Sequence, residues 1–420
     1  MRERAALVGL INDSQRPFDP EHSLDELAGL AAAAGADVVL RVLQERAKPD
    51  PATFLGSGKV LSLAQSCDAT RADAVIFDNE LSPAQLRNLE AALDRKIIDR
   101  TQLILDIFAA RARTREGKLQ VELAQLKYMM PRLVGAGAAL SRLGGGIGTR
   151  GPGETKLETD RRRIRHRISI LSKEIDTVRR RRAQLRERRH KSAVPTVALV
   201  GYTNAGKTTL FNALTGDRAV ASNALFVTLD PLLRKVKLPD RRELIVSDTV
   251  GFIERLPHTL VAAFRATLEE VAGADLLLHV IDAANPERER QVDAVRTVLE
   301  TVGADRVPTL DVFNKCDRLD ASERERLSVV SPGALCVSAL TGDGRDELIA
   351  AMESRLALDT AKVTFEFDSQ DESCRDQISQ LYRLGRILTH AVSDGHVTIE
   401  AEISRRLLAR FRREGSRVGP

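Results

Sequence analysis

Cysteine is scarce in this 420-residue chain, and long apolar runs are missing from it. The four cysteines stand far apart without CxxC or Cys/His spacing, which excludes a disulfide framework and a zinc site. They are Cys67, Cys316, Cys336 and Cys374, and we expect reduced thiols that serve packing. No apolar run approaches the roughly 20 residues that a membrane-spanning helix needs, so we expect no stable membrane insertion. Asn12 and Asp13 interrupt the stretch in which a signal peptide would stay apolar, which favours a cytoplasmic protein.

Positive charge is concentrated in one segment. The whole sequence carries +5, whereas residues 154–191 contain 15 Lys or Arg and six Asp or Glu, a net +9. The rest of the chain therefore sums to −4. A basic stripe on an otherwise slightly acidic protein favours a polyanionic partner, because phosphate contacts release counterions. The alternative is a solvated charged helix.

The apolar pattern predicts four parts, in keeping with roughly 100–200 residues per domain. Residues 1–112 alternate short apolar runs with helix-like stretches, which predicts a small parallel α/β sheet of four short strands. Residues 113–192 hold two heptad-like helices, which we expect to pack as an antiparallel pair. The glycine-rich stretch 135–160 between them is predicted to be a loop, and Pro131 should kink or end the first helix.

At about residue 193 the apolar pattern changes from heptad-like helices to alternating strands and helices, and the other two parts follow. Residues 193–358 form a longer α/β alternation that opens with the strand VPTVALVG. Residues 359–420 are predicted to be a small α+β domain with a strand KVTFEF, a helix, a hairpin turning at Asp394-Gly395, and a basic final helix SRRLLARFRR.

The third part carries a phosphate-binding signature. Residues 201–208, GYTNAGKT, match GxxxxGK[ST] between a strand and a helix. Loop amides would cradle the phosphates, Lys207 would bridge the β and γ oxygens, and Thr208 would ligate magnesium. Downstream, the strand ELIVSD ends in Asp248, placed to hold magnesium through water, and Gly251 can turn its amide toward the γ-phosphate.

The base is indicated by a second motif. The strand VPTLDVF leads into Asn314-Lys-Cys-Asp317, and a carboxylate at Asp317 can accept both N1–H and the exocyclic amine of guanine, which adenine cannot offer. The Lys315 stem would lie along the base and Asn314 would brace the loop. Ser338-Ala-Leu340 ends the next strand, where a backbone amide could read the guanine O6. Together with the P-loop, this order of motifs predicts GTP.

Three positions bear on hydrolysis. Thr228 is the best candidate for a switch residue that completes the magnesium shell when the γ-phosphate is present, with a structural threonine as the alternative. Phe252 stands where Ras-like proteins carry the glutamine that orients water, so we expect its ring to turn away from the phosphates. Asn204, within an NxGK pattern, either helps to hold a potassium ion beside the phosphates or only braces the loop.

The predicted site therefore has catalytic and ligand-binding members. Those assigned to catalysis are Lys207, Thr228, Asp248 and Gly251. Those assigned to GTP are Gly201, Tyr202, Thr203, Asn204, Ala205, Gly206, Lys207, Thr208, Thr209, Asp248, Thr249, Val250, Gly251, Asn314, Lys315, Asp317, Ser338, Ala339 and Leu340. Those assigned to metals are Thr208, Thr228 and Asp248 for Mg²⁺, and Asn204 for K⁺.

The chain resembles the HflX family of ribosome-associated, translation-factor-related GTPases. The likeness rests on GSGKV, GGGIGTRGPGETKLETDRRRIRHRI, GYTNAGKTTLFN, FVTLDPLLR and DTVGFI, which together span most of the sequence. The chain departs from the family at Leu232, where a second threonine is usual, and this leaves Thr228 with the switch assignment. The predicted fold class is α/β: a P-loop GTPase domain preceded by a small parallel α/β domain and an antiparallel long-helix pair, and followed by a small α+β domain.

Because Phe252 cannot orient water, we expect slow hydrolysis by the isolated protein and acceleration by the large ribosomal subunit. What the resemblance implies is binding to that subunit. It implies separation of stalled or vacant ribosomes under stress, with the helical pair and glycine-rich loop reaching toward the peptidyl transferase centre. The residues that we expect to contact ribosomal RNA are Arg161, Arg162, Arg163, Arg165 and Arg167. We expect a monomer. The competing hypothesis is a non-ribosomal regulatory GTPase whose basic arm binds a protein or an anionic membrane.

Overall fold

The structure is a computed structural model. It describes residues 2–11, 20–133, 152–191, 194–217, 219, 225–238, 243–255, 265–356, 360–368, 372–393, 396–404 and 417–419. The chain divides into two compact units, which we call the N-terminal unit and the C-terminal unit. The N-terminal unit comprises Met1–Val178 with Ser222–Leu229 and Leu256–Phe264, and the C-terminal unit comprises Arg179–Ala221, Asp230–Arg255 and Arg265–Pro420. The finer division into four domains stays a prediction.

A four-stranded parallel sheet forms the core of the N-terminal unit, in the order β2-β1-β3-β4. Its strands are β1 Arg4–Ile11, β2 Asp37–Glu45, β3 Ala74–Phe77 and β4 Lys96–Asp99. The parallel sheet was expected, but β1 and β2 run eight and nine residues rather than being short. The reason is that their register continues past the apolar runs into Arg4 and Asp37, which pair with one another.

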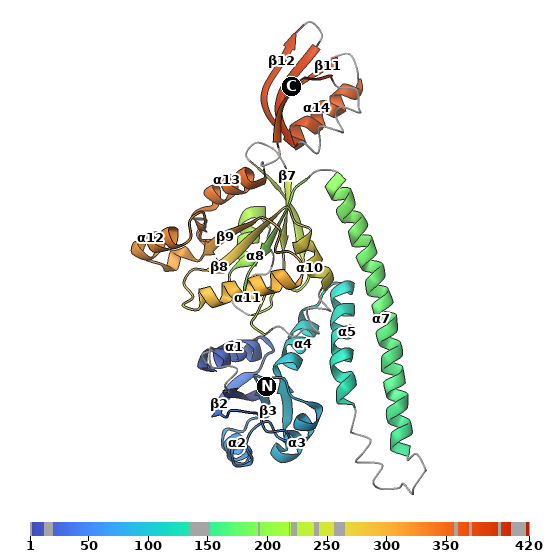
Figure 1. The fold of residues 1–420 in the computed structure, drawn as a ribbon, viewed down its shortest axis with the longest axis vertical. Helices are drawn as coiled ribbons and strands as arrows, with labels where there is room; N and C mark the ends of the chain where they lie inside the picture. Colours follow the sequence, from blue (N-terminus) through green and yellow to red (C-terminus); the bar gives the residue numbers. More distant parts are fainter. Residues whose placement is uncertain are drawn as a thin grey trace. The chain divides into compact units, whose positions relative to one another are not determined.

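Four helices connect and cover these strands (Figure 1). They are α1 Pro20–Ala33, α2 Ser57–Thr70, α3 Pro83–Leu93 and α4 Arg100–Arg111. The start of α3 is encoded locally, since Ser82 and Gln85 form a reciprocal capping box and Pro83 occupies the first helical position. The start of α4 is set by Asp99, whose carboxylate accepts from the Gln102 amide at 2.9 Å.

Two long helices follow, α5 Arg115–Arg132 and α7 Pro152–Lys191 (Figure 1). They pair antiparallel as predicted, because Arg115 contacts Glu174 whereas Glu122 contacts Arg167. An apolar seam joins them, made of Leu119, Leu123, Leu126, Ile168, Leu171 and Ile175. We call this pair the arm.

The ends of the arm helices differ in part from the sequence expectation. Pro131 lies in the last turn of α5, which ends at Arg132, as expected of a residue that removes a helical hydrogen bond. The predicted loop 135–160 is too long, because α7 already begins at Pro152. Proline is favoured at the first helical position, where the missing amide would have no helical partner. The remainder of that loop, residues 135–151, lies outside the described residues.

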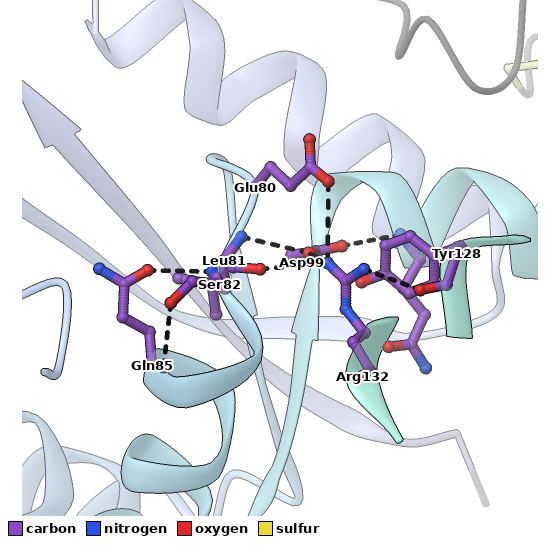
Figure 2. Close-up of polar contacts among 8 residues, drawn as sticks. Glu80, Leu81, Ser82, Gln85, Asp99, Tyr128 and Arg132 are labelled. Carbon is purple, nitrogen blue, oxygen red and sulfur yellow. Dashed lines mark hydrogen bonds and ion pairs between the residues drawn. The ribbon is translucent and has the colours of Figure 1, made fainter. Parts of the chain in front are cut away.

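The end of α5 is tied to the edge of the first sheet by Arg132 (Figure 2). Its guanidinium donates to the Asp99 carboxylate at 3.0 Å and to the backbone oxygens of Leu81 at 3.1 Å and Tyr128 at 2.9 Å. It also lies 3.4 Å from the centre of the Tyr128 ring. Asp99 is fully buried, and burial followed by this carboxylate raises the pKa of Tyr128. The buried Asp99 carboxylate therefore has a cationic partner, Arg132, at the end of α5.

A six-stranded sheet organises the C-terminal unit in the order β10-β9-β8-β5-β7-β6, parallel except for the β6–β7 pair. Its strands are β5 Thr196–Val200, β6 Leu232–Lys237, β7 Glu243–Asp248, β8 Leu276–Asp282, β9 Thr309–Asn314 and β10 Leu335–Cys336. The helices of this region are α8 Lys207–Thr215, α10 Arg265–Ala272, α11 Arg288–Thr301, the 3₁₀ turn η2 Cys316–Arg318, α12 Ala321–Val330 and α13 Arg345–Leu356. The central strands are buried on both faces, as their unbroken apolar runs predict.

A second, antiparallel sheet closes the C-terminal unit in the order β12-β13-β11-β14. Its elements are β11 Thr360–Asp368, α14 Glu372–Leu384, β12 Arg386–Ser393, β13 His396–Ser404 and β14 Arg417–Gly419. The predicted strand, helix and hairpin are present, and β14 was not predicted. The expected turn at 394–395 and the expected basic helix beyond 404 lie outside the described residues. Among the described helices, none is long and apolar enough to cross a membrane.

Candidate functional site

The loop between β5 and α8 has a backbone that requires glycine at both ends. Gly201 has φ +150° and Gly206 has φ +92°. A Cβ atom on Gly201 would come within 2.2 Å of the Val280 carbonyl oxygen, and one on Gly206 within 2.2 Å of the Asn314 side-chain nitrogen. The GxxxxG spacing therefore reflects close approach to β8 and to the loop after β9. The loop leads directly into the start of α8 at Lys207, and a helix N-terminus is a favourable place for an anion.

Lys207 begins α8 and is turned back over this loop. Its Nζ donates to the carbonyl oxygens of Gly201 at 3.1 Å and Tyr202 at 2.7 Å. Burial lowers the pKa of Lys207 to about 8, against an opposing effect of Asp248. This ammonium is thus bonded to backbone carbonyl dipoles in a buried position. Anionic phosphates would supply the missing counter-charge.

Thr208 and Asp248 meet at the foot of the loop. The Thr208 hydroxyl donates to the Asp248 carboxylate at 2.8 Å, and Asp248, at the end of β7, is fully buried. A hydroxyl and a carboxylate are hard oxygen donors of the kind that Mg²⁺ takes together with water and substrate phosphates. The residues present therefore fit a magnesium ion bound with a nucleoside triphosphate.

The segment after β7 lies directly on the phosphate loop. A Cβ atom on Gly251 would come within 2.8 Å of Thr203 Cα and 3.0 Å of Lys207 Nζ, so only glycine allows this approach. Phe252 pairs its backbone with the loop, because its amide donates to the Gly201 oxygen at 3.1 Å and its oxygen accepts from the Thr203 amide at 2.7 Å. The Phe252 side chain is fully buried.

Three residues contact one another beside the segment after β7, and the sequence did not predict that they would meet. The Tyr202 hydroxyl accepts from the Glu254 amide at 2.9 Å, and the Glu254 carboxylate pairs with Arg290 of α11 at 2.6 and 2.9 Å. Tyr202 was assigned to the loop, but its link to position 254 needs the folded chain. No local signal connects Glu254 with a helix 36 residues later.

Asn314 links the phosphate loop to the predicted base-binding loops. Its side-chain nitrogen donates to the Ala205 oxygen at 2.9 Å, and its side-chain oxygen accepts from the Ala339 amide at 2.9 Å. Asn314 is buried at the end of β9. One amide group thus fixes three loops from three separate parts of the sequence, which agrees with the expected bracing role.

The other predicted base-binding residues come together around it. The Ser338 hydroxyl donates to Asp317 at 2.7 Å, which holds that carboxylate at the loop tip. Lys315 adopts a left-handed backbone with φ +65°, and its ammonium pairs with Asp282 at 2.7 Å. Asp282 was not predicted, although a carboxylate at the end of an apolar strand was a usable signal. Leu340, the last residue of the predicted base-binding segment Ser338-Ala-Leu340, is 80% exposed.

The proposed switch residue Thr228 is placed differently. It belongs to Ser222–Leu229, which groups with the N-terminal unit, whereas the phosphate loop belongs to the C-terminal unit. Nearby Phe226 is buried edge-to-face against Phe108 of α4, with ring centres 4.7 Å apart. The structure therefore does not unite Thr228 with the other predicted site residues in one unit.

Comparison with known proteins identifies the family that carries this arrangement. Three family models match in succession: "GTP-binding GTPase N-terminal" over residues 21–109, "GTP-binding GTPase Middle Region" over 111–189, and "50S ribosome-binding GTPase" over 196–315. The chain is 45% identical over 403 residues to GTPase HflX of Escherichia coli, covering 96% of this chain and 93% of that protein. The chain belongs to the HflX family of GTPases. It is also 46% identical over 414 residues to GTPase HflX of Caldanaerobacter subterraneus, covering 98% and 93%.

Membership of the HflX family makes this chain a GTP-binding GTPase with a P-loop domain. Among solved structures, a GTP-binding protein from Sulfolobus solfataricus in complex with GDP aligns at 24% identity with a TM-score of 0.44, covering 84% of this chain and 98% of that one.

Proposed function

We propose that this HflX-family GTPase is a GTP-switched factor that binds the large ribosomal subunit and separates stalled or vacant ribosomes under stress. The observation that carries the proposal is the basic arm. Its apolar seam buries one side of α7 against α5 and leaves Arg162, Arg163 and Arg165 exposed. Exposed arginines one to three residues apart on a helix can reach several phosphates of an RNA backbone at once. A matching family model described as ribosome-binding supports the same partner.

Not every predicted arginine is equally available to RNA. Arg167 pairs with Glu122 of α5 through two contacts of 2.6 and 2.8 Å, and this hydrogen bonding raises the pKa of Arg167. Arg167 therefore helps to hold the helices together. Arg163 makes only an exposed contact of 3.6 Å with Asp160, a kind of pair that is worth little in water. The proposed RNA contact is thus centred on Arg162, Arg163 and Arg165, with Arg161 beside them.

The nucleotide would be bound as the geometry of the loops suggests. Lys207 would meet the β- and γ-phosphates, and Gly251 would present its amide to the γ-phosphate. Thr208, and Asp248 through water, would hold a magnesium ion, which would supply charge that neutralises the phosphates. Asp317 selects guanine. Thr228 would act as the switch residue that completes the magnesium shell when the γ-phosphate is present.

The attacking water needs help that Phe252 cannot give, since its ring is buried and apolar. We therefore propose that hydrolysis is slow in the free protein and is accelerated when the ribosome orders the loop around the water. Asn204, exposed with φ +60° in the phosphate loop, would help to hold a potassium ion beside the phosphates. Its replacement by alanine should remove any preference for potassium over sodium.

The decisive experiment is cosedimentation with isolated ribosomal subunits in the presence of a non-hydrolysable GTP analogue. The test variant reverses Arg162, Arg163 and Arg165 to Glu. The matched control reverses three exposed arginines of the C-terminal unit, Arg306, Arg326 and Arg345, which changes the net charge by the same amount. We expect the test variant to lose large-subunit binding and the control to keep it, with GTP affinity unchanged in both.

Salt dependence separates the arm from other modes of binding. Wild-type binding should weaken by about 10³-fold between 50 and 200 mM salt if six or more phosphates are contacted. Full binding by the test variant, or equal loss in both variants, would contradict a role for the arm. Absence of subunit binding by the wild type would favour the non-ribosomal alternative.

A further inference from the structure

One of the four cysteines, Cys316, lies in a predicted guanine-binding loop, and a second, Cys336, lies in the strand that precedes the other. Cys316 sits between Lys315 and Asp317, and Cys336 ends β10, two residues before Ser338. Their strands are neighbours, since Cys336 pairs with Phe313 in the parallel β9–β10 ladder. A hydrogen bond outside the ladder also joins the two segments, because the Cys316 amide donates to the Val337 oxygen at 3.1 Å.

The two cysteines are held in neighbouring positions. The Cys316 thiol lies 3.1 Å from the carbonyl oxygen of Phe313, the residue that pairs with Cys336 in the ladder. Both belong to one apolar cluster with Phe313 and Leu327. Cys316 is fully buried, whereas Cys336 is only half-buried. Burial, and then the neighbouring thiol, raise the pKa of Cys316 to about 12, so Cys316 stays a thiol. The less buried Cys336 is the sulfur that an oxidant reaches first.

We propose that Cys316 and Cys336 are an oxidisable dithiol that takes a peroxide-class oxidant, and that the resulting disulfide weakens guanine-nucleotide binding. The Cys336 thiolate attacks one oxygen of hydrogen peroxide, the O–O bond breaks, and a sulfenic acid and water are formed. The Cys316 sulfur then attacks the Cys336 sulfur, the S–O bond breaks, and a second water leaves with the Cys316 proton. Two thiols lose two electrons and two protons, and one peroxide becomes two waters.

The geometry of the loops explains why this disulfide would lower affinity. A disulfide holds its sulfurs about 2.05 Å apart, which is closer than two separate thiols can approach, so the bond would draw the two loops together. Cys316 would also leave the Phe313 oxygen. The adjoining contacts, Asp317 to Ser338 at 2.7 Å and Asn314 to the Ala339 amide at 2.9 Å, span the same two loops. A shift between the loops therefore moves the carboxylate and the amide that would grip guanine.

The inference rests on the proposed assignment of these loops to guanine, and the experiment keeps the two apart. The full chain carrying Cys67→Ala and Cys374→Ser is treated with hydrogen peroxide, and GDP affinity and peptide disulfides are measured before and after dithiothreitol. We expect a Cys316–Cys336 disulfide and GDP binding weakened at least about tenfold, the loss of roughly one charged hydrogen bond. Dithiothreitol should reverse both. The same chain with Cys336→Ser should bind GDP with normal affinity, and treatment with peroxide should not change that affinity.

A thermodynamic readout adds a second test. If the disulfide weakens GDP binding, saturating GDP must lower the fraction of disulfide at a fixed ratio of reduced to oxidised glutathione. No Cys316–Cys336 disulfide, unchanged affinity in the oxidised protein, or equal peroxide sensitivity in the Cys336→Ser chain would each overturn the proposal. Reduced Asp317→Asn protein is measured in parallel, because normal GDP affinity there would instead remove the loops from the guanine site.

Discussion

The nucleotide-binding loops and the basic arm handle charge in different ways. In the loops, Lys207, Asp248 and Asn314 are buried, and each is hydrogen-bonded to residues 202–208 of the phosphate-binding segment. On the arm, Arg162 and Arg165 are exposed on a helix whose opposite side packs. A buried polar group needs a fixed geometry to offset its lost hydration, which suits recognition of one ligand. Exposed charge tolerates many geometries, which suits an extended polyanion.

The arm also contains a buried charge at the end of α5, and this gives the largest predicted effect. Replacing Arg132 by Met would leave the buried Asp99 carboxylate without its cationic partner. We expect a loss of about 3 kcal/mol or more in the free energy of unfolding, typical of a buried pair with one partner removed. Thermal and urea unfolding would measure it. Arg167→Met removes an exposed pair of the same arm and should cost far less; equal effects would show that burial does not distinguish them.

Within the nucleotide loops, Asp317→Asn should have the next largest effect. The amide reverses the donor pattern that guanine requires, so GTP affinity should fall about 10²-fold or more, as expected for lost charged hydrogen bonds. Xanthosine triphosphate should bind better than GTP. Ser338→Ala keeps the carboxylate and removes only its 2.7 Å donor, so it should weaken GTP binding less and keep the preference for guanine. Nucleotide titration of both variants is the measurement, and unchanged GTP affinity in Asp317→Asn would contradict the assignment.

The smallest of these effects is a pH dependence of GTP affinity, which should come from Lys207 in the buried phosphate loop. Burial lowers the pKa of Lys207 to about 8 in the free protein, and bound phosphates must raise it again. Above pH 8 the free protein therefore loses a proton that GTP binding has to restore. Affinity should fall with a limiting slope of about tenfold per pH unit above pH 8 and be flat below about pH 7.

Calorimetry in two buffers of different ionisation enthalpy would detect the proton uptake. GMP, which has the base but no β- or γ-phosphate, is the control ligand. GTP affinity that falls no faster than that of GMP between pH 7.5 and 9 would show that Lys207 keeps its proton in the free protein.

The sequence anticipated the parts of the site that depend on short spacing. GxxxxGK[ST] fixes a strand, a loop and a helix start, and NKxD and SAL each follow a strand of the same sheet, so their meeting at one edge could be expected. It did not place Tyr202, Glu254 and Arg290 together, because Arg290 comes 36 residues later on another helix. It also overestimated the loop before α7, since glycine content outweighed the helix start at Pro152.

By itself, the sequence determined the family, the GTPase chemistry, the parallel sheets and the paired arm helices, because each rests on local spacing or on the period of apolar residues. Only the tertiary structure decided which charges are buried. Arg132 and Arg162 look alike in sequence, yet one matches Asp99 beneath the sheet edge and the other is exposed. It also decided that Cys316 and Cys336 share one cluster and that Thr228 groups with the N-terminal unit. The physical reason is that burial and contact depend on which distant segments pack together, and residue type and spacing do not record that.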